Sequence, residues 1–132
     1  MNYKIDTKEK FTVLSLLDDN LSSNLVPELN DLIKKIGTTS PKNLVLNLAA
    51  VKHWELAIME LFAQHQEEFY DNNTSFVLCC LSEDLQNALD LTEFSEVMNL
   101  TPTETEAWDI VQMEEIEREL LDSDDMEFST QE

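Results

Sequence analysis

Glycine is nearly absent from this chain, which has a single glycine in 132 residues. A loop that cradles phosphate with successive backbone N–H groups relies on several glycines, so a nucleotide-binding loop of that type is hard to build here. Cysteine is also scarce, and Cys79 and Cys80 are adjacent, so they cannot staple a secreted fold. Neighbouring side chains of a strand point to opposite faces, and we therefore expect two buried, inert thiols in a reducing compartment.

Long apolar stretches are missing as well. No run reaches the length that spans a bilayer, and the amino-terminal segment MNYKIDTKEK lacks the apolar block of a signal peptide. We therefore expect a cytoplasmic protein that does not contact membranes. The length and the hydrophobic fraction of 42% fit one globular domain.

Basic residues are few and unevenly distributed. The chain has 28 acidic and 8 basic residues, a net charge of -20. Residues 1–52 are close to neutral, whereas residues 53–132 contain one base, Arg118, and all of the excess acid. Such a field repels nucleic acid and favours partners with basic surfaces. Solubility alone is the simpler explanation of the charge.

The residue types that carry chemistry form no recognisable constellation. His53 and His65 lack the close spacing of paired metal ligands, and a zinc site would need further His or Cys nearby. His65 falls on the apolar stripe of a helical segment, which is typical of a hydrogen-bonded histidine in or near the core. No nucleophile motif is present, and abundant carboxylates do not by themselves make an acid–base pair. The sequence predicts neither an enzyme nor a metal or cofactor site.

Hydrophobic periodicity predicts strands and helices in the order β-β-α-β-α-β-α-β-α. Strands are expected at residues 2–7, 11–17, 44–51, 74–81 and 97–100, and helices at residues 25–36, 55–70, 85–91 and 104–121. Gly37 is expected to end the first helix in a left-handed conformation, and Ser82 and Thr103 are expected to cap the last two helices. Strands that alternate with helices imply a largely parallel sheet, which the first hairpin makes mixed.

The carboxyl-terminal segment differs from the rest of the chain. Residues 122–132, DSDDMEFSTQE, contain few core-forming side chains and many acids. This composition is typical of disorder, so we predict a domain at residues 1–121 followed by an acidic, disordered tail.

The order and the amino-acid sequences of five segments resemble those of STAS domains, the anti-sigma-factor antagonist proteins of bacteria. The segments, which lie between Phe11 and Trp108, are FTVLSL, PELNDLI, KNLVLNLAAV, FVLCCLSEDLQNALDLTEF and NLTPTETEAW. The resemblance implies an α/β, STAS-like fold: a small mixed sheet of about five strands with four helices, packed mainly on one face. It also implies a non-catalytic module that binds a protein partner, such as an anti-sigma factor kinase or another regulator, through the loop and helix after the central strand.

In the regulated members of that family the loop reads Asp-Ser-Ser/Thr-Gly, and phosphorylation of the second hydroxyl residue releases the partner through added charge. The corresponding residues here, 55–58, read Glu-Leu-Ala-Ile. Ala57 therefore stands at the phosphosite position, and no hydroxyl lies between Leu48 and Tyr70. The sequence thus predicts a protein-binding surface without phosphoregulation.

The predicted partner-binding residues surround the start of this helix, and they are Trp54, Glu55, Leu56, Ala57 and Glu60. In one interpretation, Trp54 and Leu56 form an exposed apolar patch ringed by acids, which would suit a partner with an apolar pocket and a basic rim. In the other, Trp54 folds back onto the core and Leu56 is an isolated exposed residue. Two other functions stay open: electrostatic sequestration of a basic protein by the acidic half and tail, and homodimerisation through the edge strand or the apolar patch.

Overall fold

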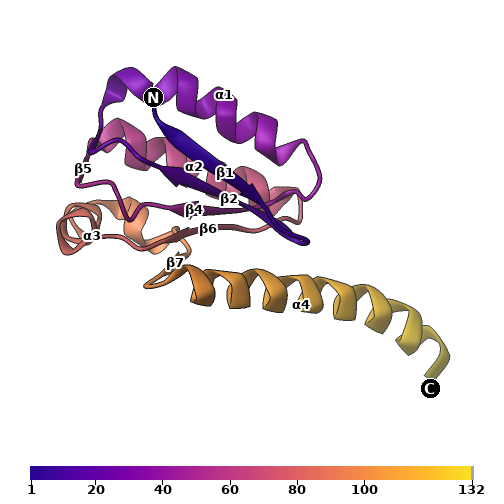
Figure 1. The fold of residues 1–132 in the computed structure, drawn as a ribbon. Helices are drawn as coiled ribbons and strands as arrows, with labels where there is room; N and C mark the ends of the chain where they lie inside the picture. The colour runs from indigo at the N-terminus through magenta and orange to yellow at the C-terminus, as the bar shows by residue number, and fades with distance from the viewer. Residues whose placement is uncertain (132) are drawn as a thin grey trace.

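The fold is built on a five-stranded mixed sheet with the strand order β1-β2-β4-β6-β7 (Figure 1). The computed structural model describes the backbone of residues 1–131 and the side chains of residues 1–121. β1 is the edge strand and pairs antiparallel with β2, whereas all other neighbours in this sheet are parallel. The strands are β1 (Tyr3–Thr7), β2 (Phe11–Leu16), β4 (Asn43–Asn47), β6 (Phe76–Cys79) and β7 (Leu100–Thr101). The predicted mixed sheet of about five strands is confirmed.

The helices form a layer on each face of the sheet. Three of them pack in one large core cluster on the first face, and the fourth crosses the opposite face (Figure 1). The first layer contains α1 (Val26–Gly37), α2 (Leu56–Asp71) and α3 (Glu83–Asp90), with the short turns η1 (Ser23–Leu25) and η2 (Glu93–Glu96). The second layer is α4 (Glu104–Gln131) alone. Packing mainly on one face is therefore confirmed.

The central strand β4 is covered on both faces, which explains why its sequence is almost continuously apolar. Leu44 and Leu46 belong to the cluster under α1 and α2, whereas Val45 belongs to the cluster under α4. Alternate side chains of a strand point to opposite faces, so a strand that is covered on both sides needs apolar residues at every position. All three side chains are fully buried.

A second, very small sheet joins two loops that the sequence did not predict to pair. β3 (Asn20–Leu21) lies parallel to β5 (His53–Trp54), with Leu21 opposite Trp54. Each strand has two residues, which is too short for a periodic pattern in the sequence. This pairing holds the loop after β2 beside the loop after β4.

The predicted helix caps are partly confirmed. Ser82 Oγ accepts a hydrogen bond from the Leu85 N–H at 3.2 Å, and Thr103 Oγ1 accepts one from the Glu106 N–H at 3.2 Å. The left-handed cap at Gly37 is wrong, because no glycine has a positive φ. Gly37 is instead the last residue of α1, and a Cβ there would lie 3.3 Å from Cζ of Phe69. The glycine therefore serves the close approach of an aromatic ring from α2.

The two cysteines also depart from expectation. Cys79 is fully buried, and burial raises the pKa of its thiol. Cys80 lies just outside β6 with a φ of 66°, so the strand alternation no longer applies, and the two Sγ atoms approach to 3.6 Å. The prediction that these side chains point to opposite faces is wrong, and Cys80 is only half-buried.

The end of the last helix differs from the prediction. α4 continues past Leu121 to Gln131, so the backbone of most of the predicted tail is helical. The aspartate, serine and threonine residues of this segment have low helix propensity, so the local sequence alone does not predict the extension. Glu132 lies outside the described residues, and the division into a domain at 1–121 and a tail at 122–132 stays a prediction. In the part of the chain that the structure describes, no helix is both long and apolar enough to cross a bilayer.

Candidate functional site at the junction of β4 and α2

The candidate site is the loop that joins β4 to α2, at the carboxyl end of the parallel strands. In open α/β sheets this edge is where binding sites are usually built. Backbone hydrogen bonds hold the loop in place: the Leu48 N–H donates to the Cys79 carbonyl of β6 at 3.1 Å, and the Val51 N–H donates to the Leu48 carbonyl at 3.0 Å. Asn47 Oδ1 also accepts from the Ala49 N–H at 2.9 Å. The loop is therefore a defined surface that presents the start of α2.

A neighbouring loop, residues 17–24, borders this surface through the β3–β5 pairing. The Asp19 carbonyl accepts hydrogen bonds from the N–H groups of Lys52 and His53, at 2.7 and 3.0 Å. The Glu55 N–H donates to the Leu21 carbonyl at 3.0 Å. The sequence analysis did not include residues 17–24 in the site, and no local signal pointed to them, because the contact depends on two-residue strands far apart in the chain.

Trp54 does not contribute to an exposed patch, so the first of the two interpretations is wrong for this residue. Its side chain is only 6% exposed, and Nε1 donates to the Leu85 carbonyl at 3.2 Å. The indole also packs near Phe62, with ring centroids 6.1 Å apart. Strand alternation in β5 turns Trp54 inward and leaves His53 exposed. Trp54 therefore belongs to the core between α2 and α3, as the second interpretation of the sequence expected.

Glu55 has a structural partner. It precedes the first residue of α2, but no side-chain bond caps that helix. Its carboxylate instead accepts a hydrogen bond from the backbone N–H of Ser23, at the start of η1. Glu55 therefore links the start of α2 to the loop that leads into α1.

The other three predicted residues lie on the first turns of α2 with graded exposure. Leu56 is 59% exposed, Ala57 is half-buried and Glu60 is exposed. The first turn of α2 has no acidic residue. The structure thus places Leu56, Ala57 and Glu60 together at one helix start, with Leu56 as the large apolar side chain that reaches solvent there.

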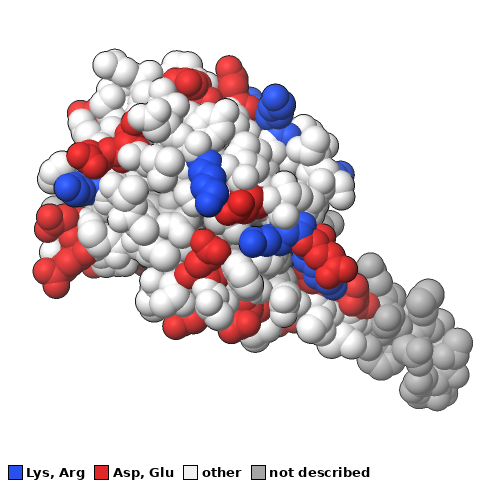
Figure 2. Space-filling model, viewed as in Figure 1, with Lys and Arg blue, Asp and Glu red and all other residues white. Residues whose placement is uncertain are grey.

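The charge around the site is mixed, unlike that of the lower part of the molecule. In the view of Figure 2, acidic side chains predominate around α3 and on α4, while basic side chains lie near α1, β1 and the loops beside β5, and also at the end of the β1–β2 hairpin next to α4. Lys52 and His53 are both exposed next to Glu55. A partner that docks on the β4–α2 junction therefore meets an apolar side chain between charges of both signs.

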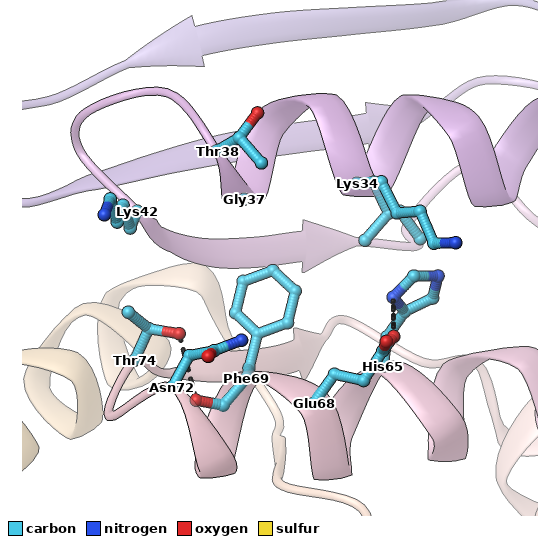
Figure 3. Close-up of a pocket in the computed structure, with 10 residues that line it drawn as sticks. Lys34, Gly37, Thr38, Lys42, His65, Glu68, Phe69, Asn72 and Thr74 are labelled. Atoms are coloured by element: carbon cyan, nitrogen blue, oxygen red, sulfur yellow. Dashed lines mark hydrogen bonds and ion pairs between the residues drawn. The ribbon is translucent and has the colours of Figure 1, made fainter.

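A large pocket lies away from this junction, between α1 and the second half of α2 (Figure 3). Its volume is about 510 Å³, and the Phe69 ring and His65 form part of its wall. His65 is 2% exposed, with Nε2 at 2.9 Å from Asn30 Oδ1 and Nδ1 at 3.3 Å from Glu68 Oε1. Burial lowers the pKa of His65 more than the attraction of Glu68 raises it, and Lys34 lowers it further. The prediction of a hydrogen-bonded core histidine is confirmed.

Comparison with known proteins identifies the family. The sequence model of the STAS domain matches residues 4–107. An anti-sigma factor antagonist from Mycobacterium paratuberculosis has a similar structure, with 21% identity, a TM-score of 0.74, and coverage of 84% of this chain and 93% of that chain. A STAS domain protein from Planctomyces limnophilus, described as an anti-sigma-factor antagonist, matches with 18% identity, a TM-score of 0.72, and coverage of 83% and 97%. The Bacillus cell fate determinant SpoIIAA in its phosphorylated form matches with 16% identity, a TM-score of 0.60, and coverage of 83% and 99%.

At these identities the structural matches report a shared fold, and they agree with the strand order and the helix layers described above. The family match carries more weight, because it spans well over half of the chain. The protein is therefore a member of the STAS domain family.

Proposed function

We propose that this protein is a non-catalytic, cytoplasmic regulator that binds a protein partner through the start of α2, without a phosphorylation switch. The family includes anti-sigma factor antagonists, which supports a protein partner in general. The observation that carries the proposal is Leu56, a large apolar side chain 59% exposed at the first position of α2. Exposed apolar side chains beside charged ones are the usual composition of the centre of a docking surface.

The composition of this surface opposes a charge switch. Ala57 occupies the position that resembles the phosphosite, and residues 49–69 contain no Ser, Thr or Tyr. A phosphate at the start of a helix would change the local charge by almost two units, but residues 49–69 have no hydroxyl side chain that a kinase could phosphorylate. We therefore expect no control of the complex by phosphorylation of a hydroxyl in this loop.

The experiment is a capture assay with two matched single variants. Leu56→Asp places a charge at the centre of the proposed surface, and Leu91→Asp makes the same change at an 89% exposed leucine after α3. We expect the native protein and Leu91→Asp to retain the same partner from a lysate of the source organism, and Leu56→Asp to lose it. Equal retention by both variants would refute the surface.

Salt separates this proposal from electrostatic sequestration. Binding through an apolar contact persists when the ionic strength is raised, because screening acts on charges and the Debye length falls to about 3 Å at about 1 M salt. Capture that disappears in moderate salt, and that Leu56→Asp does not affect, would favour the acidic half of the chain as the binding element. Sedimentation at two protein concentrations tests the homodimer.

A further inference from the structure

The inward face of α4 is fully occupied. Ala107 and Val111 are completely buried in one cluster with Val45 and Val77 of the sheet. A polar group of contacts, which we call the anchor network, continues along the same face toward the carboxyl end of the helix. It consists of bonds from Asn43 to Glu115 (2.7 Å), from Ser75 to Glu114, from Asn99 to Glu114 (3.3 Å), and from Arg118 to Asn43 (3.5 Å) and Ser75 (3.4 Å). These contacts fix which face of α4 looks away from the sheet.

The outward face carries apolar side chains. Met113, Ile116 and Leu120 are each more than half exposed, and their spacing of three and four residues places them in one stripe. Leu121, which is 65% exposed, lies beside the stripe. A soluble monomer rarely leaves several large apolar side chains adjacent on its surface, and such a patch marks an interaction site. We call Met113, Ile116, Leu120 and Leu121 the α4 stripe.

The α4 stripe lies outside the part of the chain that defines the family. The family match ends at residue 107, whereas the stripe begins at Met113, and α4 continues past the end of the sheet (Figure 1). The docking surface proposed above is on α2, among the matched residues. The stripe is therefore separate from the proposed α2 surface, and a different binding partner has to be considered for it.

Charge identifies the chemistry of that occupant. Four exposed acids border the stripe, two before it and two within its length: Glu106, Asp109, Glu117 and Glu119. The one base of α4 among the described residues, Arg118, does not offset them, because its guanidinium is directed to the anchor network, where Nη2 also lies 3.7 Å from Glu115 Oε2. Beside the stripe, a hollow of about 490 Å³ is lined by Glu117, Leu121 and the exposed Tyr70.

We propose that the α4 stripe is a docking surface for a basic amphipathic helix of a partner protein. An apolar face of that helix would cover Met113, Ile116 and Leu120, and lysine or arginine side chains on its flanks would pair with the four bordering acids. The side chains of the α4 stripe and the four bordering acids are already exposed, so binding there requires no rearrangement of the sheet or of α2. Binding at α4 and binding at α2 can therefore occur at the same time.

A second copy of this chain fits the same surface poorly. A two-fold contact places each patch against itself, so the four acids of one α4 would face the same four acids of the other. Like charges that meet in an interface oppose association, and no exposed base on the described part of α4 relieves them. A basic partner removes this repulsion, and that difference decides between the two occupants.

The test uses a synthetic peptide helix with leucine on one face and lysine on its flanks, and a second peptide in which serine replaces each leucine. The key variant is the triple substitution Met113→Gln, Ile116→Gln, Leu120→Gln, which preserves charge and helix propensity. The control is Leu91→Gln with Val97→Gln, which removes exposed apolar side chains outside α4. Far-UV circular dichroism verifies that each variant retains its helices.

We expect the leucine–lysine peptide to bind the native chain, the control and Leu56→Asp equally, and to bind the triple variant at least about tenfold more weakly, which corresponds to about 1.4 kcal/mol. The serine–lysine peptide should bind all variants equally and be released by salt. Equal affinity of the leucine–lysine peptide for the native chain and the triple variant would overturn the proposal. So would sedimentation as a dimer that the triple variant dissociates, since the stripe would then be covered by a second copy.

Discussion

Replacement of Trp54 by alanine tests whether this residue is part of the core or of a docking surface. The indole is 6% exposed, packs near Phe62, and donates its N–H to the Leu85 carbonyl. The substitution removes a large buried side chain from the region between α2 and α3, and it leaves the Leu85 carbonyl without that donor. A role in the core therefore predicts a large loss of stability, whereas an exposed residue would predict almost none.

The magnitude follows from the burial. Deletion of a buried Trp or Phe side chain to alanine costs about 3–5 kcal/mol. The native state of a domain of this size is stable by about 5–15 kcal/mol, so Trp54→Ala should remove at least about a fifth of the stability. Trp54→Phe retains an aromatic ring but loses the hydrogen bond to the Leu85 carbonyl, which contributes about 0.5–1.5 kcal/mol. Leu56→Ala, at an exposed position of α2, should change the stability by no more than about 0.5 kcal/mol.

Urea unfolding followed by far-UV circular dichroism is the appropriate assay, because fluorescence would itself change when Trp54 is replaced. Equal slopes of the unfolding transitions would show that the variants share one native and one unfolded state. The expected order of free energy loss is Trp54→Ala, then Trp54→Phe, then Leu56→Ala. A Trp54→Ala protein that loses less than about 1 kcal/mol would refute the assignment of this side chain to the core.

Two further predictions concern stability. The Asn43 side chain is 3% exposed; it donates to the Lys10 carbonyl at 2.8 Å and accepts from the Ser75 N–H at 2.8 Å, besides its bonds within the anchor network, so Asn43→Ala should cost about 2–4 kcal/mol in urea unfolding. Asn47→Ala, at a half-buried position, should cost less. The reverse order would contradict the importance of the buried hydrogen bonds of Asn43. Because burial holds the pKa of His65 below the unfolded value of 6.5, its contribution to stability is present at neutral pH and is lost as the pH falls below about 6.5. The native protein should therefore lose more free energy of unfolding than His65→Gln between about pH 7.5 and about pH 5.5, and identical losses would contradict this reasoning.

Local sequence signals predicted the strands and helices because each signal lies within the element it predicts. The apolar run of β4 and the change of period after Trp54 both reflect what covers those residues, and burial on two faces or on one stripe is visible in a short window. The cap at Ser82 depends on a neighbour three residues away, so it was also predictable. The family resemblance rested on the same segments.

Other features depended on residues far apart in the chain. The sequence predicts Gly37 as a left-handed helix cap, but the glycine instead makes room for the Phe69 ring, which comes from another helix. Glu55 was assigned to a partner surface, but its carboxylate also accepts a hydrogen bond from Ser23. Neither contact leaves a pattern within a window of one element, since each joins two elements that meet only after the sheet has formed.

The sequence by itself determined the STAS-like order of strands and helices, the absence of Ser, Thr and Tyr from residues 49–69, and the excess of acid in the second half of the chain. These properties need only the identity and spacing of neighbouring residues. The tertiary structure decided that Trp54 is interior while Leu56 is exposed, and that α4 turns Met113, Ile116 and Leu120 outward. The direction of a side chain depends on which face of its element the rest of the fold covers, and that cover is supplied by β3, α3 and the sheet, which are distant in sequence.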